Sequence, residues 1–319
     1  MTDRFHRCPI CSGASIGRRM LLRDDRYGYP GSYPLLQCAD CGHGFLGVNF
    51  TATALGELYT NHYPRRNFSL EDHRPYTERK GIGAWLDGDR ASPFRWVPRD
   101  VRVLDIGCGF GESLGYHRAR GCDVYGVEVD ENIRRVADAF GYQVHVGLFD
   151  PDVYARDYFD YVTMSQVIEH VVDPVQTLRG VARILRSGGK AILSTPNANG
   201  WGATVFGRRW INWHAPYHLQ FFTHRSMELA AEQVGLTVQR AVTVTPSAWL
   251  HYQWIHLLSY PAEGRSSVFW ASGGPWTLPQ KLALGALQLL HRCKVNHVVT
   301  RLFDALGRGD SRVFVLRKP

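Results

Sequence analysis

The chain has 319 residues, of which 45% are hydrophobic and 21% are charged, a composition typical of a globular protein with one large core and a second small unit. Lysine and arginine outnumber the acids by 37 to 29, which gives a formal charge of +8. Because the basic residues are scattered, the charge permits an anionic partner but does not predict nucleic-acid binding.

The sequence contains no stretch of about eighteen apolar residues, so we predict no membrane-spanning helix, although contact with a membrane surface stays open. Residues 1–7 lack the apolar run of a secretion signal. We therefore expect a cytoplasmic location. Thiols stay reduced there, and the seven cysteines need an interpretation other than disulfides.

Two Cys-x-x-Cys pairs lie near the N-terminus, Cys8 with Cys11 and Cys38 with Cys41. Each pair places two thiolates on one side of a tight turn, and two such turns complete a tetrahedron around zinc. The residues between the pairs are enough for a short hairpin. We therefore predict that residues 1–48 form a zinc-ribbon module with a structural Zn²⁺, the alternatives being a redox pair or unrelated thiols.

The region from 49 to 98 is predicted to be a connector with helical segments at 54–59 and 76–86. From residue 101 the pattern changes to strands alternating with helices, which is typical of a parallel, doubly wound sheet. We predict strands at 101–106, 123–128, 142–146, 158–165, 190–195, 236–244 and 312–317, and helices at 111–120, 131–140, 174–186 and 223–235.

Residues 245–311 interrupt this alternation before the last strand. They are rich in tryptophan and other apolar residues, and we interpret them as an apolar insertion that forms a lid or a packing layer. A helical stripe within them consists of Val295, Val298, Val299, Leu302, Phe303 and Leu306. The rest of the region 99–319 is the catalytic domain in this interpretation.

A glycine-rich loop follows the first predicted strand of this domain, with the sequence DIGCGFG at 105–111. Glycines let the backbone approach a ligand closely beside a helix N-terminus. The spacing is Gly-x-Gly-x-Gly rather than that of dinucleotide folds, and Asp105 would repel a pyrophosphate. The pattern instead favours a ligand with a cationic amino-acid end. Glu128, which ends the second strand, could accept both hydroxyls of a ribose.

The segments VLDIGCGFG at 103–111 and GVE at 126–128 resemble the first two motifs of class I S-adenosylmethionine-dependent methyltransferases. FDYV at 159–162 and VIEHV at 167–171 are similar to the fourth-strand region of that family, and LRSGG at 185–189 and STPN at 194–197 to the fifth. The resemblance implies an α/β, Rossmann-like sheet of seven strands with one antiparallel strand, for which 312–317 is the candidate.

The family also implies roles for residues at matching positions. Asp105, Gly107, Gly109 and Gly111 would hold the methionine part of S-adenosylmethionine, and Glu128 the ribose. Leu148 and Phe149 would lie near the adenine, with Asp150 near its amino group. Gln166 would border the sulfonium end.

A hydroxyl acceptor benefits from a general base, and histidine suits that role at neutral pH. His170 follows the fourth strand, and His214 and His218 follow the fifth. YHLQFFT at 217–223 is similar to a segment of zinc-containing C-methyltransferases of deoxysugars, in which the matching histidine lies at the active site. We therefore expect His218 to be the base, with His170 as the competing candidate.

The chain is too short for the additional C-terminal domain of those C-methyltransferases. It resembles more closely the shorter bacterial methyltransferases that carry an N-terminal zinc ribbon and modify sugars or polysaccharides. O-methylation of a sugar, glycan or related small molecule is therefore our first expectation. The alternatives are O-methylation of a quinone or phenolic lipid, sugar C-methylation, ribosomal RNA methylation, and a non-catalytic binding protein. The oligomeric state is not predicted.

Overall fold

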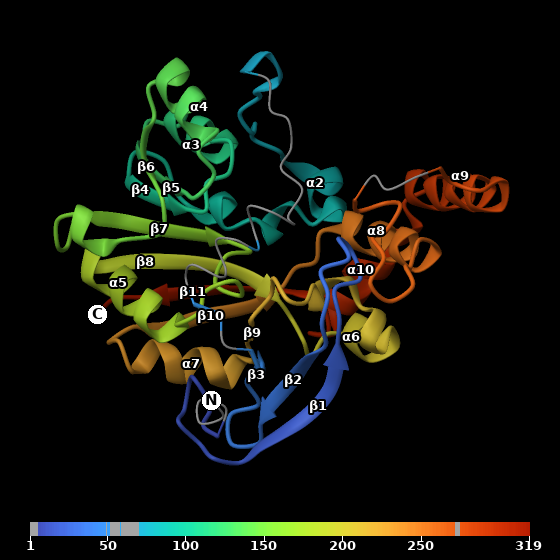
Figure 1. Ribbon diagram of the computed structural model, residues 1–319. Coiled ribbons are helices and arrows are strands. Elements are labelled where there is room, and N and C mark those ends of the chain that lie inside the picture. Colours follow the sequence, from blue (N-terminus) through green and yellow to red (C-terminus); the bar gives the residue numbers. More distant parts are fainter. Residues whose placement is uncertain (1–5, 49, 52–57, 59–69, 272–274) are drawn as a thin grey trace.

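The computed structural model describes residues 6–48, 50–51, 58, 70–271 and 275–319 (Figure 1). A seven-stranded sheet has the order β10-β11-β8-β7-β4-β5-β6. The bounds are β4 Arg102–Ile106, β5 Asp123–Glu128, β6 Gln143–Val146, β7 Phe159–Ser165, β8 Leu185–Pro196, β10 Thr237–Thr243 and β11 Ser311–Arg317. The predicted Rossmann-like sheet is confirmed, and β11 is antiparallel to both of its neighbours, as expected for the last strand.

Helices cover both faces of this sheet: α3 (Glu112–Arg118), α4 (Ile133–Phe140), α5 (Pro174–Ile184) and α7 (His224–Glu232). In Figure 1, α3 and α4 lie above the sheet, and α5 and α7 lie below it. Alternate residues of β4 therefore enter two cores: Leu104 and Ile106 pack in the cluster that includes α5 and α7, whereas Val103 packs in the one that includes α3 and α4. Burial on both faces explains why the central strand β4 is mostly apolar, whereas the edge strands β6 and β10 are more polar and partly exposed.

Helix α5 ends earlier than predicted. We expected it to extend to Arg186, but it ends at Ile184, and Leu185 has an extended backbone with φ −70° and ψ 136°. Leu185 is fully buried and pairs with Phe159 of β7. The gain from burying Leu185 in the sheet outweighs continuation of the helix. The register with β7 then shifts between Leu185 and Lys190, where Gly188 has a φ of +78°.

The N-terminal segment forms a second sheet of β1 (Ile16–Leu22), β2 (Tyr33–Cys38), β3 (Gly44–Leu46) and β9 (Gln220–Phe221). The predicted hairpin between the cysteine pairs is β1–β2. The fourth strand comes from the catalytic part of the chain, since Phe45 pairs with Gln220. A shared apolar cluster joins Leu35 and Leu46 to Trp210 and Trp213.

The connector contains η2 (Leu70–Asp72), α2 (Gly81–Asp87), η3 (Asp89–Ala91) and η4 (Pro93–Trp96). The helix expected at 76–86 begins only at Gly81, because the backbone of Lys80 is extended. The helical segment predicted at 54–59 lies outside the described residues apart from Leu58, which is helical and buried.

After β8 come α6 (Trp201–Val205), η6 (Gly207–Arg209) and η7 (Ile211–Trp213), and after β10 come α8 (Ser247–Leu258), α9 (Leu278–Arg292) and α10 (Val295–Ala305). Helix α10 confirms the helical spacing of the predicted stripe. The stripe itself divides: Phe303 stacks on Trp201 with ring centroids 4.3 Å apart, whereas Val298 and Leu302 are exposed. Among the described residues, no helix combines the length and apolar character needed to cross a bilayer.

Candidate active site and zinc centre

The glycine-rich loop joins β4 to α3 at the carboxyl edge of the sheet. Gly107, Gly109 and Gly111 have φ values of +76°, +57° and +80°, a region that favours glycine. A Cβ on Gly107 would lie 2.5 Å from a methyl group of Val167. A Cβ on Gly109 would meet no described atom within 4 Å, so the backbone there faces open space. The loop therefore offers exposed backbone to a ligand.

Asp105 lies beneath this loop and is buried. Its two carboxylate oxygens accept hydrogen bonds from the hydroxyls of Ser113 in α3 and Thr163 in β7, the latter at 2.6 Å. Burial raises the pKa of Asp105 to about 6, although both hydroxyls lower it. In this structure Asp105 fixes the loop between two strands and a helix, a positioning role beyond the cofactor contact that we expected.

Glu128 ends β5 and lies beside the glycine loop. One carboxylate oxygen accepts the backbone N–H of Gly109 at 2.9 Å, and the other accepts those of Val129 and Asp130 at 2.8 and 3.0 Å. Burial raises the pKa of Glu128, and these backbone hydrogen bonds oppose the shift. The carboxylate is thus held rigidly at the strand end, where the predicted ribose contact requires it.

The three residues expected near the adenine follow β6. Leu148 is exposed, Phe149 is half-buried against Gly180, and Asp150 accepts the N–H of Asp152 to cap a short helical turn. An exposed leucine beside the strand ends could cover a planar base. The roles of these three residues stay predictions.

Gln166 follows β7 with a φ of +55°. With its amide oriented to satisfy its neighbours, the nitrogen donates to Glu169 and the oxygen accepts from Ser194, both at 3.0 Å. Glu169 is fully buried, and burial raises its pKa to about 8, so its carboxyl group is largely protonated at neutral pH. Gln166 thereby links the ends of β7 and β8 at the edge where the glycine loop lies.

The structure brings His170 and His218 together, with ring centroids 4.6 Å apart and planes at 86°. His170 Nδ1 contacts the carbonyl of Tyr217 at 3.0 Å, and His218 Nδ1 contacts that of Asn212 at 2.8 Å. Because a carbonyl only accepts, the proton of each neutral ring is on Nδ1, and Nε2 is the unprotonated nitrogen. Burial lowers the pKa of His170 to about 4 and holds the pKa of His218 well below its usual value, so both rings are neutral.

Glu169 belongs to the same cluster. One of its oxygens and one nitrogen from each of His170 and His218 lie within 4.8 Å of one another. The backbone carbonyl of Glu169 also accepts the N–H groups of Leu219 and Gln220, at 2.7 and 3.0 Å. These bonds tie the loop after β7 to the segment that carries His218. The arrangement can act as a base, and its spacing also suits a cation.

The four N-terminal cysteines form a second polar centre. Their sulfur atoms lie within 4.8 Å of one another, with Cys8 Sγ 3.6 Å from Cys41 Sγ and Cys11 Sγ 3.5 Å from Cys38 Sγ. A tetrahedral zinc with bonds of about 2.3 Å places its sulfurs about 3.8 Å apart. The donor set therefore fits zinc, and four thiolates leave no open position for catalysis.

Comparison with known proteins decides the family. Residues 72–241 match a family model described as a methyltransferase domain, which covers more than half of the chain. The chain belongs to the methyltransferase family. The seven-stranded sheet and the glycine loop agree with the S-adenosylmethionine-dependent methyltransferase motifs in the sequence.

The relatives of this methyltransferase include two bacterial enzymes named ubiquinone biosynthesis O-methyltransferase. The one from Aeromonas salmonicida is 30% identical over 151 residues, which are 43% of this chain and 63% of that protein. The one from Pseudomonas fluorescens is 30% identical over 168 residues, 47% of this chain and 72% of that protein. The chain thus spans less than two thirds of the first relative. A solved methyltransferase from Mesorhizobium loti is 18% identical, with 74% of this chain and 98% of that one covered and a TM-score of 0.44.

Two residues beside the histidines of the methyltransferase were missed by sequence reasoning. Tyr27, in the β1–β2 loop, packs edge-on against His214 and Tyr217, with centroids 5.8 and 5.5 Å away. The positive charge of Arg26 adds to the effect of burial in lowering the pKa of His170, His214 and His218. In the sequence, the glycines and the proline of this loop indicate a turn of the hairpin. No feature of the loop indicates contact with the active site.

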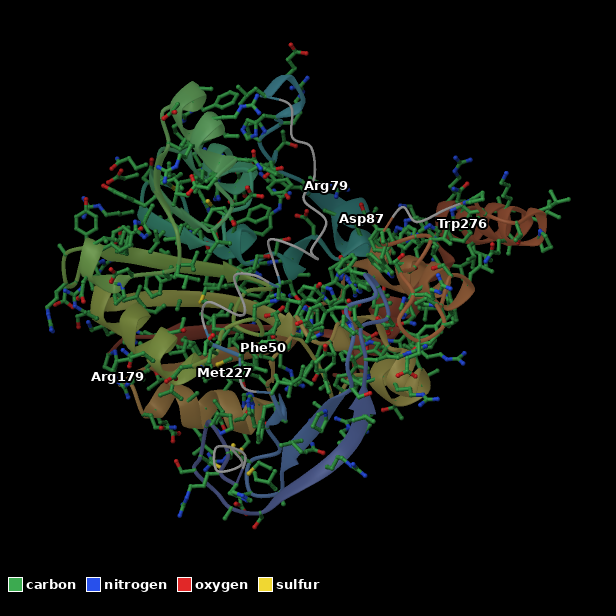
Figure 2. All side chains as sticks on the ribbon, in the orientation of Figure 1. Phe50, Arg79, Asp87, Arg179, Met227 and Trp276 are labelled. Carbon is green, nitrogen blue, oxygen red and sulfur yellow. The ribbon has the colours of Figure 1, made fainter. Side chains whose placement is uncertain are left out.

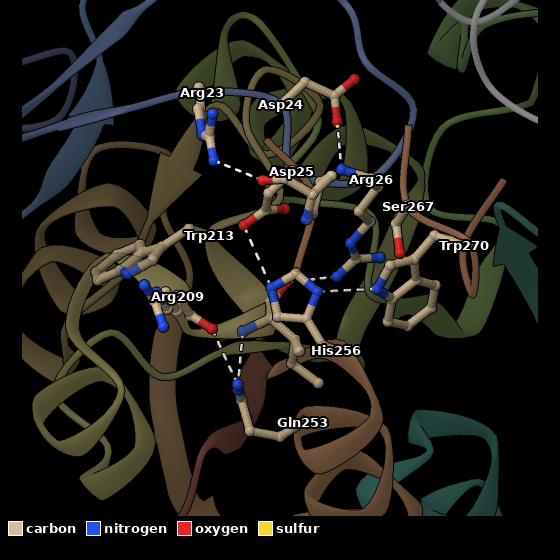
Figure 3. A network of polar contacts seen from close by, with 12 residues as sticks. Arg23, Asp24, Asp25, Arg26, Arg209, Trp213, Gln253, His256, Ser267 and Trp270 are labelled. Carbon is tan, nitrogen blue, oxygen red and sulfur yellow. Dashed lines mark hydrogen bonds and ion pairs between the residues drawn. The ribbon is translucent and has the colours of Figure 1, made fainter. Parts of the chain in front are cut away.

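A buried polar network fixes that loop against the methyltransferase domain (Figure 3). His256 of α8 faces Asp25 at 3.3 Å through Nε2 and accepts the indole N–H of Trp270 at 3.0 Å through Nδ1. Arg26 stacks on Trp270 at 4.1 Å and donates to the carbonyl of Ile211. The N-terminal segment therefore forms one wall of the histidine cluster.

Proposed function

We propose that this methyltransferase transfers the methyl group of S-adenosylmethionine to a hydroxyl of a phenolic or quinone-type small molecule. The observation that carries the proposal is the buried histidine pair, His170 and His218, whose rings meet edge-on beside Glu169. The sugar hydroxyl that the sequence favoured has less support, because the relatives named above act in ubiquinone biosynthesis according to their names.

The pKa values of the histidines support a phenolic acceptor. Burial lowers the pKa of His218, the proposed base, as well as that of His170, which makes both rings weak bases. A phenol, with a pKa of about 10 like that of tyrosine, gives up its proton more readily than an aliphatic sugar hydroxyl. The positive charge of Arg26 near the cluster would also stabilise a phenolate.

In this proposal the cofactor supplies an electrophilic methyl group. Gly107, Gly109 and Gly111 hold its amino-acid end, and Glu128 accepts the ribose hydroxyls. Leu148 and Phe149 cover the adenine with Asp150 near its amino group, and Gln166 borders the sulfonium. His218 accepts the proton of the acceptor, and the aromatic side chains around it exclude water, so that the enzyme acts mainly by positioning.

The organisation of the chain is part of the proposal. Residues 1–48 form the zinc-ribbon module, with Zn²⁺ held by Cys8, Cys11, Cys38 and Cys41. Residues 49–98 form the connector and 99–319 the methyltransferase domain, within which 245–311 is an insertion. Because β3 and β9 share a sheet, the zinc would stabilise the segment that carries His218.

The test is a panel of acceptors incubated with isotopically labelled cofactor, comparing soluble catechols with hexoses and nucleotide-linked hexoses. We expect a labelled methyl ether on the catechols, with little label on the sugars. Binding of S-adenosylhomocysteine, measured by calorimetry on the same sample, shows that the protein is competent. The proposed acceptor class would be overturned if only the sugars were methylated. It would also be overturned if protein that binds S-adenosylhomocysteine methylated none of the catechols.

A further inference from the structure

Helix α10 buries polar side chains and exposes apolar ones, which is the reverse of an ordinary surface helix. Its buried residues are polar: Asn296, His297, Thr300 and Arg301. Its exposed residues include Val295, Val298 and Leu302, and Leu306 follows at the C-cap. A spacing of three, four and four residues places these four aliphatic side chains on one face, because each residue turns the helix by about 100°. A surface helix in water normally presents the opposite arrangement.

Helix α9, which precedes α10 by two residues, carries a second exposed apolar stripe. Leu278, Leu282 and Leu289 are 71%, 69% and 61% exposed, and their spacing places them within about 40° of one another around the helix. None of the described side chains of α9 is buried. In Figure 1 this helix extends away from the body of the protein, and Figure 2 labels Trp276 just before it.

The exposed charged side chains around α9 and α10 are all positively charged. Between residues 264 and 309 the sequence contains only one acidic side chain, Asp304. Asp304 is paired with Arg301 at 2.8 Å, and its side chain is 10% exposed. The exposed charged residues of the region are all basic: Arg265, Lys281, Arg292, Lys294 and Arg308. Of these, Lys294 pairs with Asp87 of α2 at 3.3 Å. Lys281 and Arg292 lie on neighbouring rows of α9, beside the leucine stripe.

We propose that helices α9 and α10 dock this methyltransferase on the surface of an anionic phospholipid membrane. Aliphatic stripes flanked by cations are what an interfacial helix inserts between anionic headgroups. The charge of the patch selects this occupant over a second copy of the chain, because two such faces would bring like charges together. The inference does not depend on the acceptor, since the helices lie outside the histidine cluster.

The test is sedimentation of the full chain with vesicles of phosphatidylcholine alone or of phosphatidylcholine mixed with phosphatidylglycerol. We expect binding to the mixed vesicles that weakens in high salt. Leu282→Asn/Leu289→Asn should weaken the affinity for the mixed vesicles about a hundredfold. The reason is that each leucine removed from the interface lowers this affinity about tenfold or more. Lys281→Glu/Arg292→Glu should abolish the preference for the anionic lipid.

Val153→Asn is the matched control, because Val153 is an exposed aliphatic residue on η5 (Pro151–Val153), in another part of the chain. It should bind vesicles like the wild type. Circular dichroism and light scattering establish that each variant is folded and report its oligomeric state. The proposal is wrong if the wild type does not bind the anionic vesicles, or if Leu282→Asn/Leu289→Asn binds them as tightly as the wild type does. A stable dimer that this double variant dissociates would assign the face to a second copy instead.

Discussion

Replacing Glu128 by alanine tests the cofactor site at a single side chain. The carboxylate ends β5 and accepts the backbone N–H of Gly109 from the glycine loop. One oxygen, Oε1, already accepts two backbone N–H groups, and Oε2 accepts one, so the lone pair that remains for a ribose hydroxyl is on Oε2. Hydrogen bonds to a charged group contribute about 1.5–3 kcal/mol each, and water replaces part of the loss, so we expect a net cost of about 2 kcal/mol in binding. This corresponds to a roughly 30-fold weaker Kd.

The assay is isothermal calorimetry with S-adenosylhomocysteine. Because Glu128 also accepts the N–H groups of Val129 and Asp130, the variant should lose some stability, and its melting temperature is measured beside its affinity. Glu131→Ala is the control, since Glu131 is exposed and pairs only with Arg134 among the described residues. If folded Glu128→Ala binds within about twofold of the wild type, the ribose assignment is refuted.

Three further predictions address the other centres. Metal analysis should find zinc in the wild type and none in Cys38→Ser/Cys41→Ser; retention by the variant would place the ligands elsewhere. His218→Ala should lower turnover by roughly 10²–10⁴-fold with unchanged cofactor affinity, whereas the exposed His224→Ala should match the wild type; full turnover in His218→Ala would make His218 a packing residue. Burial raises the pKa of Asp310 from 3.8 to about 7, so stability should fall as pH rises between these values. Asp310→Asn should make this fall shallower in urea titrations across that range, the remainder coming from Asp105 and Glu169, whose pKa values are also raised. Parallel curves for the two proteins would contradict the shift.

The sheet could be predicted because its physical signals are local. Strands buried on both faces are apolar runs, and glycines mark the turn after β4, so β4, β5 and β7 were found close to their observed bounds. The short strand β9 gave no such signal, because two residues carry no periodicity and its partner β3 lies far away in the sequence. The end of α5 was wrong because tertiary burial of Leu185 decided it.

The candidate site divides in the same way. The glycine loop, Glu128 and the histidines follow strands in a recognisable order, which predicts their meeting at one edge of the sheet. Arg26 and Tyr27 reach the histidines only through packing of a loop whose composition indicates a turn and nothing more. The stripe of α10 was found by its spacing, but the spacing alone could not show that Val298 and Leu302 face outward.

The pairing of β3 with β9 constrains how the chain acquires its structure during synthesis. Phe45 emerges from the ribosome early, whereas its partner Gln220 is made only after most of the chain. Until then the edge of β3 and the face of Leu35 that Trp213 covers remain open to other chains. Early capture of zinc by the cysteines would hold the hairpin in register during that interval. We therefore expect nascent chains made under zinc starvation to aggregate more than mature protein stripped of its metal.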